Sequence, residues 1–240
     1  MSPVPDLMKP AMNIPSLTPF TGPAADRIDL LGPVHKALRR FMFDTLVRVG
    51  AFDVTMRGEL EETINLVERL LFVMGEQQSG AACTVSTLRR APASERRAVS
   101  AQLYRELTEL VTLRLYLMLE EEAHTLPTLW HRHTDSELAR IRLDRLAALD
   151  VNELREAMHW MAGALTPQEL ADVLEDLHAT TGTLLFRTAL DTLREGLDAQ
   201  RWARVTQSLA RATGTGAAKA AMPHGALRQD TPPTQLALVA

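Results

Sequence analysis

The chain has 240 residues, of which 46% are hydrophobic and 23% charged, a composition typical of a soluble globular protein. Its net charge of −4 offers no electrostatic footprint for nucleic acid, and no apolar run reaches the roughly 18 residues of a membrane span. A single cysteine, Cys83, excludes an internal disulfide and a cysteine-based zinc site. These features favour a cytoplasmic protein that binds neither nucleic acid nor membrane.

Both ends of the chain lack helical periodicity. Residues 1–28 are rich in proline, serine and threonine, have no apolar core of a signal peptide, and predict a disordered N-terminal arm. Residues 213–240 are rich in glycine, alanine, threonine and proline and predict a disordered tail. Nearly every segment between them has helical periodicity and none reads as a strand, so the predicted fold class is all-α.

The first helix is predicted at about residues 33–50, because Pro33 suits a first helical turn and Gly50 suits the position just past an end. Its inner stripe has apolar residues at spacings of three and four, among them Leu38 and Met42. One member of that stripe is a histidine, His35.

A second helix is expected at about 55–74, and the segment 75–82 then breaks the pattern, which leaves Cys83 in a loop. The third helix, about 94–124, is the most apolar and is predicted to end at Pro127. Its predicted inward residues are Leu103, Leu107, Leu110, Leu113 and Leu117. Because Leu115, Tyr116 and Leu119 lie on its other sides, this helix is expected to be central or covered by the C-terminal part.

Five shorter helices follow, at about 135–149, 152–165, 167–178, 183–197 and 200–212. Thr134 and Glu137 make a capping box, and Thr166 before Pro167 marks another helix start. Short linkers favour antiparallel neighbours. We expect residues 29–149 to form a bundle and residues 150–212 a helical extension packed on it. The predicted core includes Leu38, Met42, Leu107, Leu110 and Leu117.

Three stretches carry a pattern more specific than periodicity alone. Residues 33–53 read PVHKALRRFMFDTLVRVGAFD, residues 119–138 read LEEEAHTLPTLWHRHTDSEL, and residues 158–177 read MHWMAGALTPQELADVLEDL. In this order they resemble the hemerythrin-like (HHE cation-binding) family of bacterial proteins, over roughly residues 28–210. The resemblance implies an antiparallel four-helix bundle whose interior holds one or two irons, bound by inward histidines and carboxylates.

Most of that ligand set is missing from this chain. His35 matches the first ligand of the family, but residues 75–80 (GEQQSG) and 94–97 (SERR) stand where histidine-containing motifs are expected. Leu117 or Leu119 stands where a late ligand histidine is expected, although Glu121 and Glu122 remain. The resemblance therefore implies a degenerate metal site.

Helical phase indicates which histidine–carboxylate pairs face a bundle interior. The pairs Glu156/His159 and Glu175/His178 fall off the apolar stripes of their helices, whereas Glu121 and His124 share the phase of the inward leucines. Glu137, four residues after His133, is better explained as the capping acid than as a ligand.

The candidate metal site is therefore His35, Glu121 and His124, joined by Glu122 or Glu76 as further candidates. Two histidines and one carboxylate suit mononuclear non-haem iron, and zinc would accept them too. A buried histidine and glutamate can equally satisfy each other as a hydrogen-bonded pair.

Two functions of different class follow as hypotheses. In the first, which we favour, the chain is a degenerate, metal-free bundle, and this hypothesis leans against an enzyme without deciding the question. The bundle acts as a binding or regulatory module, with a small apolar ligand in the former metal pocket or a protein partner on its surface. In the second, non-haem iron at a reduced site binds dioxygen or nitric oxide or catalyses oxidative chemistry. The sequence leaves open whether the surface of Trp130, Trp160 and Trp202 closes on itself or on a second copy, as a homodimer.

Overall fold

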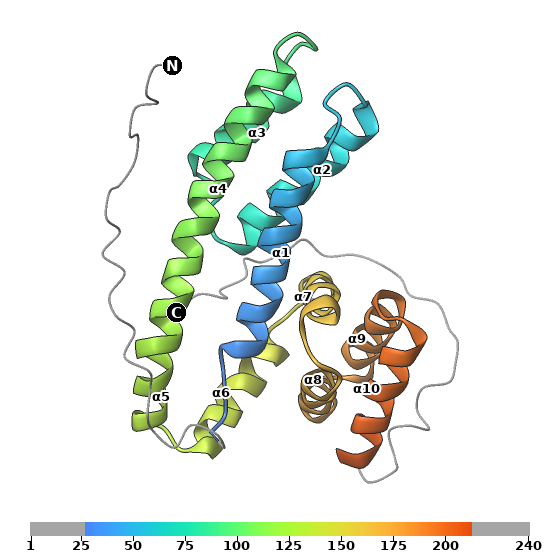
Figure 1. The fold of residues 1–240 in the computed structure, drawn as a ribbon. Coiled ribbons are helices and arrows are strands. Elements are labelled where there is room, and N and C mark those ends of the chain that lie inside the picture. Colours follow the sequence, from blue (N-terminus) through green and yellow to red (C-terminus); the bar gives the residue numbers. More distant parts are fainter. Residues whose placement is uncertain (1–26, 213–240) are drawn as a thin grey trace, which may run out of the picture.

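The computed structural model describes residues 27–212, and within that range the chain is helical throughout, without a strand (Figure 1). The all-α prediction is therefore confirmed. The predicted tail at 213–240 and the predicted arm, apart from Arg27 and Ile28, lie outside the described residues. None of the described helices is both long enough and apolar enough to cross a membrane.

The first four helices form a bundle in which each helix packs against two others. They are α1 (Gly32–Ala51), α2 (Arg57–Val73), α3 (Gly80–Arg90) and α4 (Arg96–Glu120). Helix α1 contacts α2 and α4, and α3 closes the ring from the other side by contacting the same two helices. Figure 1 shows the four helices lying alongside one another. Their core is formed by residues such as Phe41, Met42, Ile64, Leu88 and Leu107.

The turn after α2 explains where that helix ends. Gly75 has φ +73°, a left-handed conformation that glycine adopts without steric cost. The amide of Glu76 donates to the carbonyl of Leu71 and so closes the last turn. The predicted break is thus confirmed at Gly75, but it is shorter than predicted. Ser79 caps a new helix, and Cys83 is an exposed residue of α3 rather than part of a loop.

The sequence predicted that the third helix ends at Pro127, but the helical run of α4 continues past this residue. It passes into a π-helix, η1 (Glu121–Thr125), and then into α5 (Leu126–Arg132), where Pro127 occupies the first turn. Proline is tolerated there because the amide it lacks would have no helical partner in that helix. The chain then turns into α6 (Asp135–Ala147), whose predicted capping box between Thr134 and Glu137 is present.

The apolar stripe of α4 differs from the predicted one. Leu103 and Leu107 are buried as predicted, but Leu113 is 57% and Leu117 41% exposed, and Leu110 is half-buried. The buried stripe continues instead through Val111, Arg114 and Met118. Tyr116 and Leu119 are also more than two-fifths exposed, so the outer face of α4 is not covered by the C-terminal helices.

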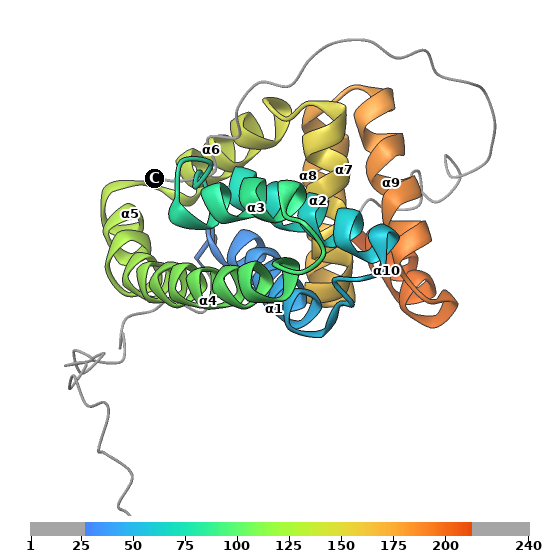
Figure 2. The ribbon, with the colours of Figure 1, turned by 90° about the horizontal axis from the view of Figure 1, so that it is seen from above.

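A second core lies beside the bundle and is built by the last four helices (Figure 2). They are α7 (Val151–Ala164), α8 (Pro167–Thr180), α9 (Thr183–Gly196) and α10 (Ala199–Ala212), close to the predicted boundaries. Helix α7 packs on α9, and α8 packs on α10 and on α6.

Helix α1 connects the two cores because it packs on α7 as well as on its bundle neighbours. Ala37 belongs to the C-terminal core, whereas Leu38 and Phe41 belong to the bundle core. The ring of Phe41 stacks on Trp160 of α7, with centroids 4.0 Å apart. The seam between the two groups of helices is therefore packed, and it is beside this seam that the candidate site lies.

Candidate functional site

His35 is buried at the N-terminal end of α1 between two glutamates of η1. Its Nδ1 atom lies 2.7 Å from Glu122 Oε1 and its Nε2 atom 3.0 Å from Glu121 Oε2. Arg39 Nη2 donates to the same oxygen of Glu122 at 2.7 Å, and Arg114 Nη1 lies 3.6 Å from Glu121 Oε1. We call these five residues the His35 cluster. Each ring nitrogen of His35 thus faces a carboxylate oxygen.

Helical spacing accounts for the position of the two glutamates. Glu121 and Glu122 follow the buried Met118 by three and four residues, so they continue the buried stripe of α4 into the π-helix η1. Glu121 and Glu122 open this segment and both turn toward α1, with side chains 25% and 32% exposed. Two adjacent carboxylates thus reach opposite edges of one imidazole ring.

His124 is separated from its predicted partners. Its side chain is 71% exposed and lies 3.5 Å from Glu120, on the outer side of the helix. The prediction that His124 shares an inward face with Glu121 is wrong, because its phase was taken from a stripe that includes the exposed Leu117 rather than from the buried Arg114 and Met118. Glu76 lies in the turn between α2 and α3, where its carbonyl accepts from the Ser79 hydroxyl, and it is not part of the His35 cluster.

The remaining histidine–carboxylate pairs are also apart from the cluster. His159, His178 and Glu175 are exposed, in agreement with their phase. Glu156 differs from its prediction, since it is half-buried and accepts a hydrogen bond from Trp160 Nε1 at 2.8 Å.

The arrangement around His35 does not fit the predicted three-ligand metal site. His124, one of the three predicted ligands, is 71% exposed and lies beside Glu120 rather than beside His35. Glu121 and Glu122 lie on opposite edges of the ring, so one ion cannot bind both of them together with the imidazole in this geometry. Across residues 27–212, no group of three histidine, cysteine, aspartate or glutamate side chains is placed to hold a metal.

A cavity of about 290 Å³ lies next to the cluster, between the bundle and the C-terminal helices. Its walls come from α1, α4, α6 and α7, together with Val73 at the end of α2. Most of the lining is apolar, including Val34, Leu38, Met158, Trp160 and Met161. The polar lining consists of His35, Arg114, Arg142, Arg145, Glu153 and Glu156. An apolar cavity with a few convergent polar groups is the usual form of a small-molecule site.

The sequence analysis missed two residues of the His35 cluster, Arg39 and Arg114. Arg114 is only 9% exposed, and its Nε atom has no hydrogen-bond partner. The signal was available, because Leu103, Leu107, Val111, Arg114 and Met118 repeat at spacings of three and four. The predicted stripe was based on leucines alone and was wrong beyond Leu107. An arginine within a stripe of apolar residues indicates a buried cation.

Arg142 differs from Arg114 because its carboxylate partner is within hydrogen-bond distance. Its Nη2 atom donates to Asp176 Oδ1 at 3.1 Å, and its Nε atom lies 2.7 Å from Asp176 Oδ2. Burial raises the pKa of Asp176, and the charge of Arg142 opposes that rise. This pair joins α6 to α8, and Arg142 also lines the cavity.

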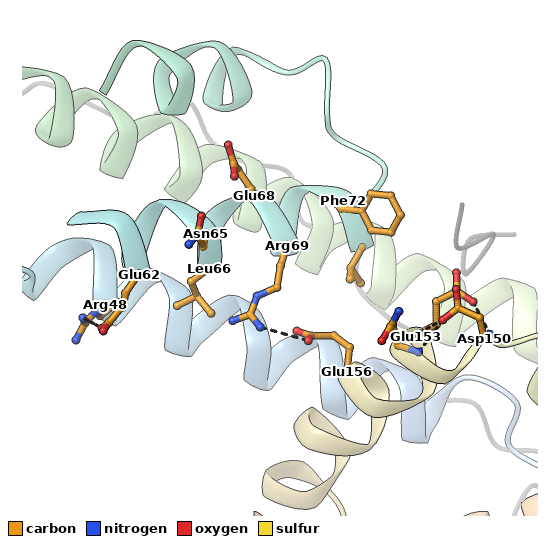
Figure 3. A pocket seen from close by; sticks show the side chains of 12 residues that line it. Arg48, Glu62, Asn65, Leu66, Glu68, Arg69, Phe72, Asp150, Glu153 and Glu156 are labelled. Atoms are coloured by element: carbon orange, nitrogen blue, oxygen red, sulfur yellow. Dashed lines mark hydrogen bonds and ion pairs between the residues drawn. The ribbon is translucent and has the colours of Figure 1, made fainter. Parts of the chain in front are cut away.

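A larger and more open groove of about 990 Å³ adjoins the cavity (Figure 3). It runs between α2 and the first turns of α7, and it shares Val73, Glu153 and Glu156 with the cavity wall. Figure 3 shows Arg69 reaching across the groove to Glu156, where Nη1 and Oε2 are 3.4 Å apart. Glu156 therefore stands between the groove and the cavity.

Comparison of the chain with protein-family models, with curated proteins and with solved structures found no match.

Proposed function

We propose that this protein is a metal-free binding module of hemerythrin-like descent that holds a small, mainly apolar ligand between its bundle and its C-terminal helices. The observation that carries the proposal is the pairing of His35 with two carboxylates beside a cavity of about 290 Å³. The ring nitrogens that a metal would need are engaged by the protein itself, and the adjacent space has mostly apolar walls. Such a site binds by burying apolar surface rather than by coordination.

The location of the cavity also suits a regulatory role. Its walls belong to both groups of helices, so a ligand inside it contacts α1 and α4 on one side and α6 and α7 on the other. A ligand that prefers one placement of these helices shifts the protein toward that placement. In this proposal the protein acts in the cytoplasm without catalysing a reaction, and the altered surface is read by a partner protein or by a second copy of the chain.

The competing proposal is a non-haem iron protein that binds dioxygen or nitric oxide. One observation favours it: His35 Nε2 lies beside Glu121, while Glu122 contacts Nδ1, as an orienting carboxylate does in many metal sites. Against it stands the ligand number, since His124 points away and only His35 and Glu121 would remain.

Metal content separates the two proposals. The protein is purified without chelator, incubated anaerobically with Fe(II), desalted and analysed by elemental mass spectrometry. We expect far less than one metal per chain, with no difference between the wild type and a His35→Ala variant. His159→Ala, at an exposed position of α7, controls for loss of a surface histidine. Stoichiometric iron or zinc that disappears only in His35→Ala would refute the metal-free proposal.

A further inference from the structure

The buried guanidinium of Arg114 is the least satisfied polar group of the cavity. Its Nε–H has no hydrogen-bond acceptor, and the carboxylate oxygen nearest to Nη1 is 3.6 Å away, beyond normal hydrogen-bond length. A buried cation without full hydrogen bonding carries a large desolvation cost. A group that supplies acceptor oxygens to Arg114 would therefore be bound strongly.

The other charged groups of the lining already have partners. Arg142 is paired with Asp176, Glu156 accepts from Trp160, and Glu153 accepts from the amide of Asp150. On the cluster side, an incoming cation would meet the guanidinium of Arg114. An anion would instead complete the hydrogen bonding of Arg114, for which a planar carboxylate is the best geometric match.

We infer that the ligand is a small amphipathic carboxylate, with its carboxylate bound to Arg114 and its apolar part against Val34, Leu38, Met158 and Met161. This inference rests on the proposed function and specifies its ligand class. The volume of about 290 Å³ corresponds to on the order of ten water-sized groups, which is the size of a medium-chain fatty acid. Inorganic anions such as phosphate would satisfy Arg114 but leave the apolar walls without contact.

The test uses octanoate and 1-octanol as probes, because the two share an alkyl chain and differ in charge. Binding to the wild-type protein is measured by isothermal titration calorimetry, and we expect one octanoate per chain with an affinity at least tenfold above that for octanol. Arg114→Met retains an apolar side chain of similar length and should lower octanoate affinity about tenfold to a hundredfold, the value of a charge-assisted hydrogen bond. Octanol affinity should remain within about threefold of wild type.

Two further variants keep the result interpretable. Arg105→Met removes an exposed arginine of the same helix and should leave octanoate binding unchanged. Arg114→Lys keeps the charge without the planar fork and should retain part of the binding. In the absence of probe, Arg114→Met should unfold at a higher temperature than wild type, because it removes an unsatisfied buried cation while Glu121 keeps its contact with His35.

Each outcome bears on a different claim. If octanol binds as tightly as octanoate, or if Arg114→Met binds octanoate within twofold of wild type, the carboxylate inference is overturned and the apolar binding function stands. If neither probe binds to the wild-type protein, the cavity does not hold a small apolar ligand, and both the inference and the proposed function fail.

Discussion

At His35 the side chain that resembles a metal ligand is held by its own protein. Each ring nitrogen has a carboxylate within 3.0 Å, and one of those carboxylates also receives Arg39. The two glutamates therefore lie among the imidazole of His35 and the guanidinium groups of Arg39 and Arg114. The network gives both edges of the imidazole a partner and leaves only Nε of Arg114 without one. It also fixes the start of α1 against η1, which positions one wall of the cavity.

One residue after His35, the side chain of Lys36 links α1 to the start of α8. Its ammonium group donates to the carboxylate of Glu169, which also accepts from the backbone amide and hydroxyl of Thr166. Partial burial raises the pKa of Glu169, but the hydrogen bonds from Lys36 and Thr166 outweigh burial and lower it overall.

This lowered pKa predicts a pH-dependent contribution to stability. A group whose pKa is lower in the folded state than in the unfolded state stabilises the fold above its unfolded pKa, and this contribution is lost as the pH falls through the folded pKa. We expect Glu169→Gln to lower the melting temperature at neutral pH, with the difference from wild type shrinking in the acid range below the usual pKa of glutamate.

The measurement is a series of thermal melts from neutral to acid pH. Glu175→Gln, at an exposed position of the same helix, serves as the control and should track the wild type throughout. A Glu169→Gln deficit that stays constant down to strongly acid pH would contradict the assigned ion pair.

The side of helix α4 that is buried determines which of its residues reach the cavity. The leucine-based stripe and the observed stripe share Leu103 and Leu107 but separate further along, so Leu117 is exposed while Met118 is fully buried. The sequence is ambiguous there because apolar residues occur on every side of this part of the helix. Packing against α1 and α3 selects the stripe that places Arg114 at the cavity.

The leucine-based stripe and the observed stripe predict opposite effects on stability when Leu117 or Met118 is truncated. Met118→Ala should reduce the free energy of unfolding by about 2–5 kcal/mol, as is usual for truncating a buried side chain. Leu117→Ala should reduce it by less than about 1 kcal/mol, because the side chain remains partly in water. Urea denaturation of both variants measures the difference. Equal losses, or a larger loss for Leu117→Ala, would favour the leucine stripe over the observed one.

A helix could be predicted from the sequence where the residues that determine its ends lie within one turn of them. Capping residues such as Thr134 and Thr166 act within one turn, and the helix starts that they mark were predicted within one or two residues. Helix α3 was missed because its short stripe follows a glycine-rich turn that resembles a loop. His124 was misplaced because its phase was taken from the leucine stripe rather than from the buried one. The convergence of Glu121 with His35 was predicted, whereas that of Arg114 required the packed structure.

The whole molecule has two apolar cores that share α1 and meet at the stacked rings of Phe41 and Trp160. Neither core is complete without α1, because Ala37 contributes to one and Leu38 to the other. Small helical cores bury too little surface to be stable alone, so shared burial favours one cooperative unit.

We therefore expect a single unfolding transition. In urea, far-ultraviolet circular dichroism and tryptophan fluorescence should give coincident midpoints, since the first reports all helices and the second includes Trp160 at the seam. Phe41→Ala should lower both midpoints together, with a loss of about 3–5 kcal/mol. Its matched control, Phe43→Ala on the half-exposed face of α1, should change neither by much. Separate midpoints for the two probes would show that the cores unfold independently.

The double role of α1 also constrains how this architecture can change in evolution. Helices α7 to α10 follow the bundle in sequence, as an appended module would, yet they pack on the first helix of that bundle. Deleting them would expose Ala37 and Val34 to water and open the cavity to solvent. Substitutions along α1 must satisfy two neighbours at once, so the first helix should be the slowest segment of the chain to diverge and the last helices should change only in step with it.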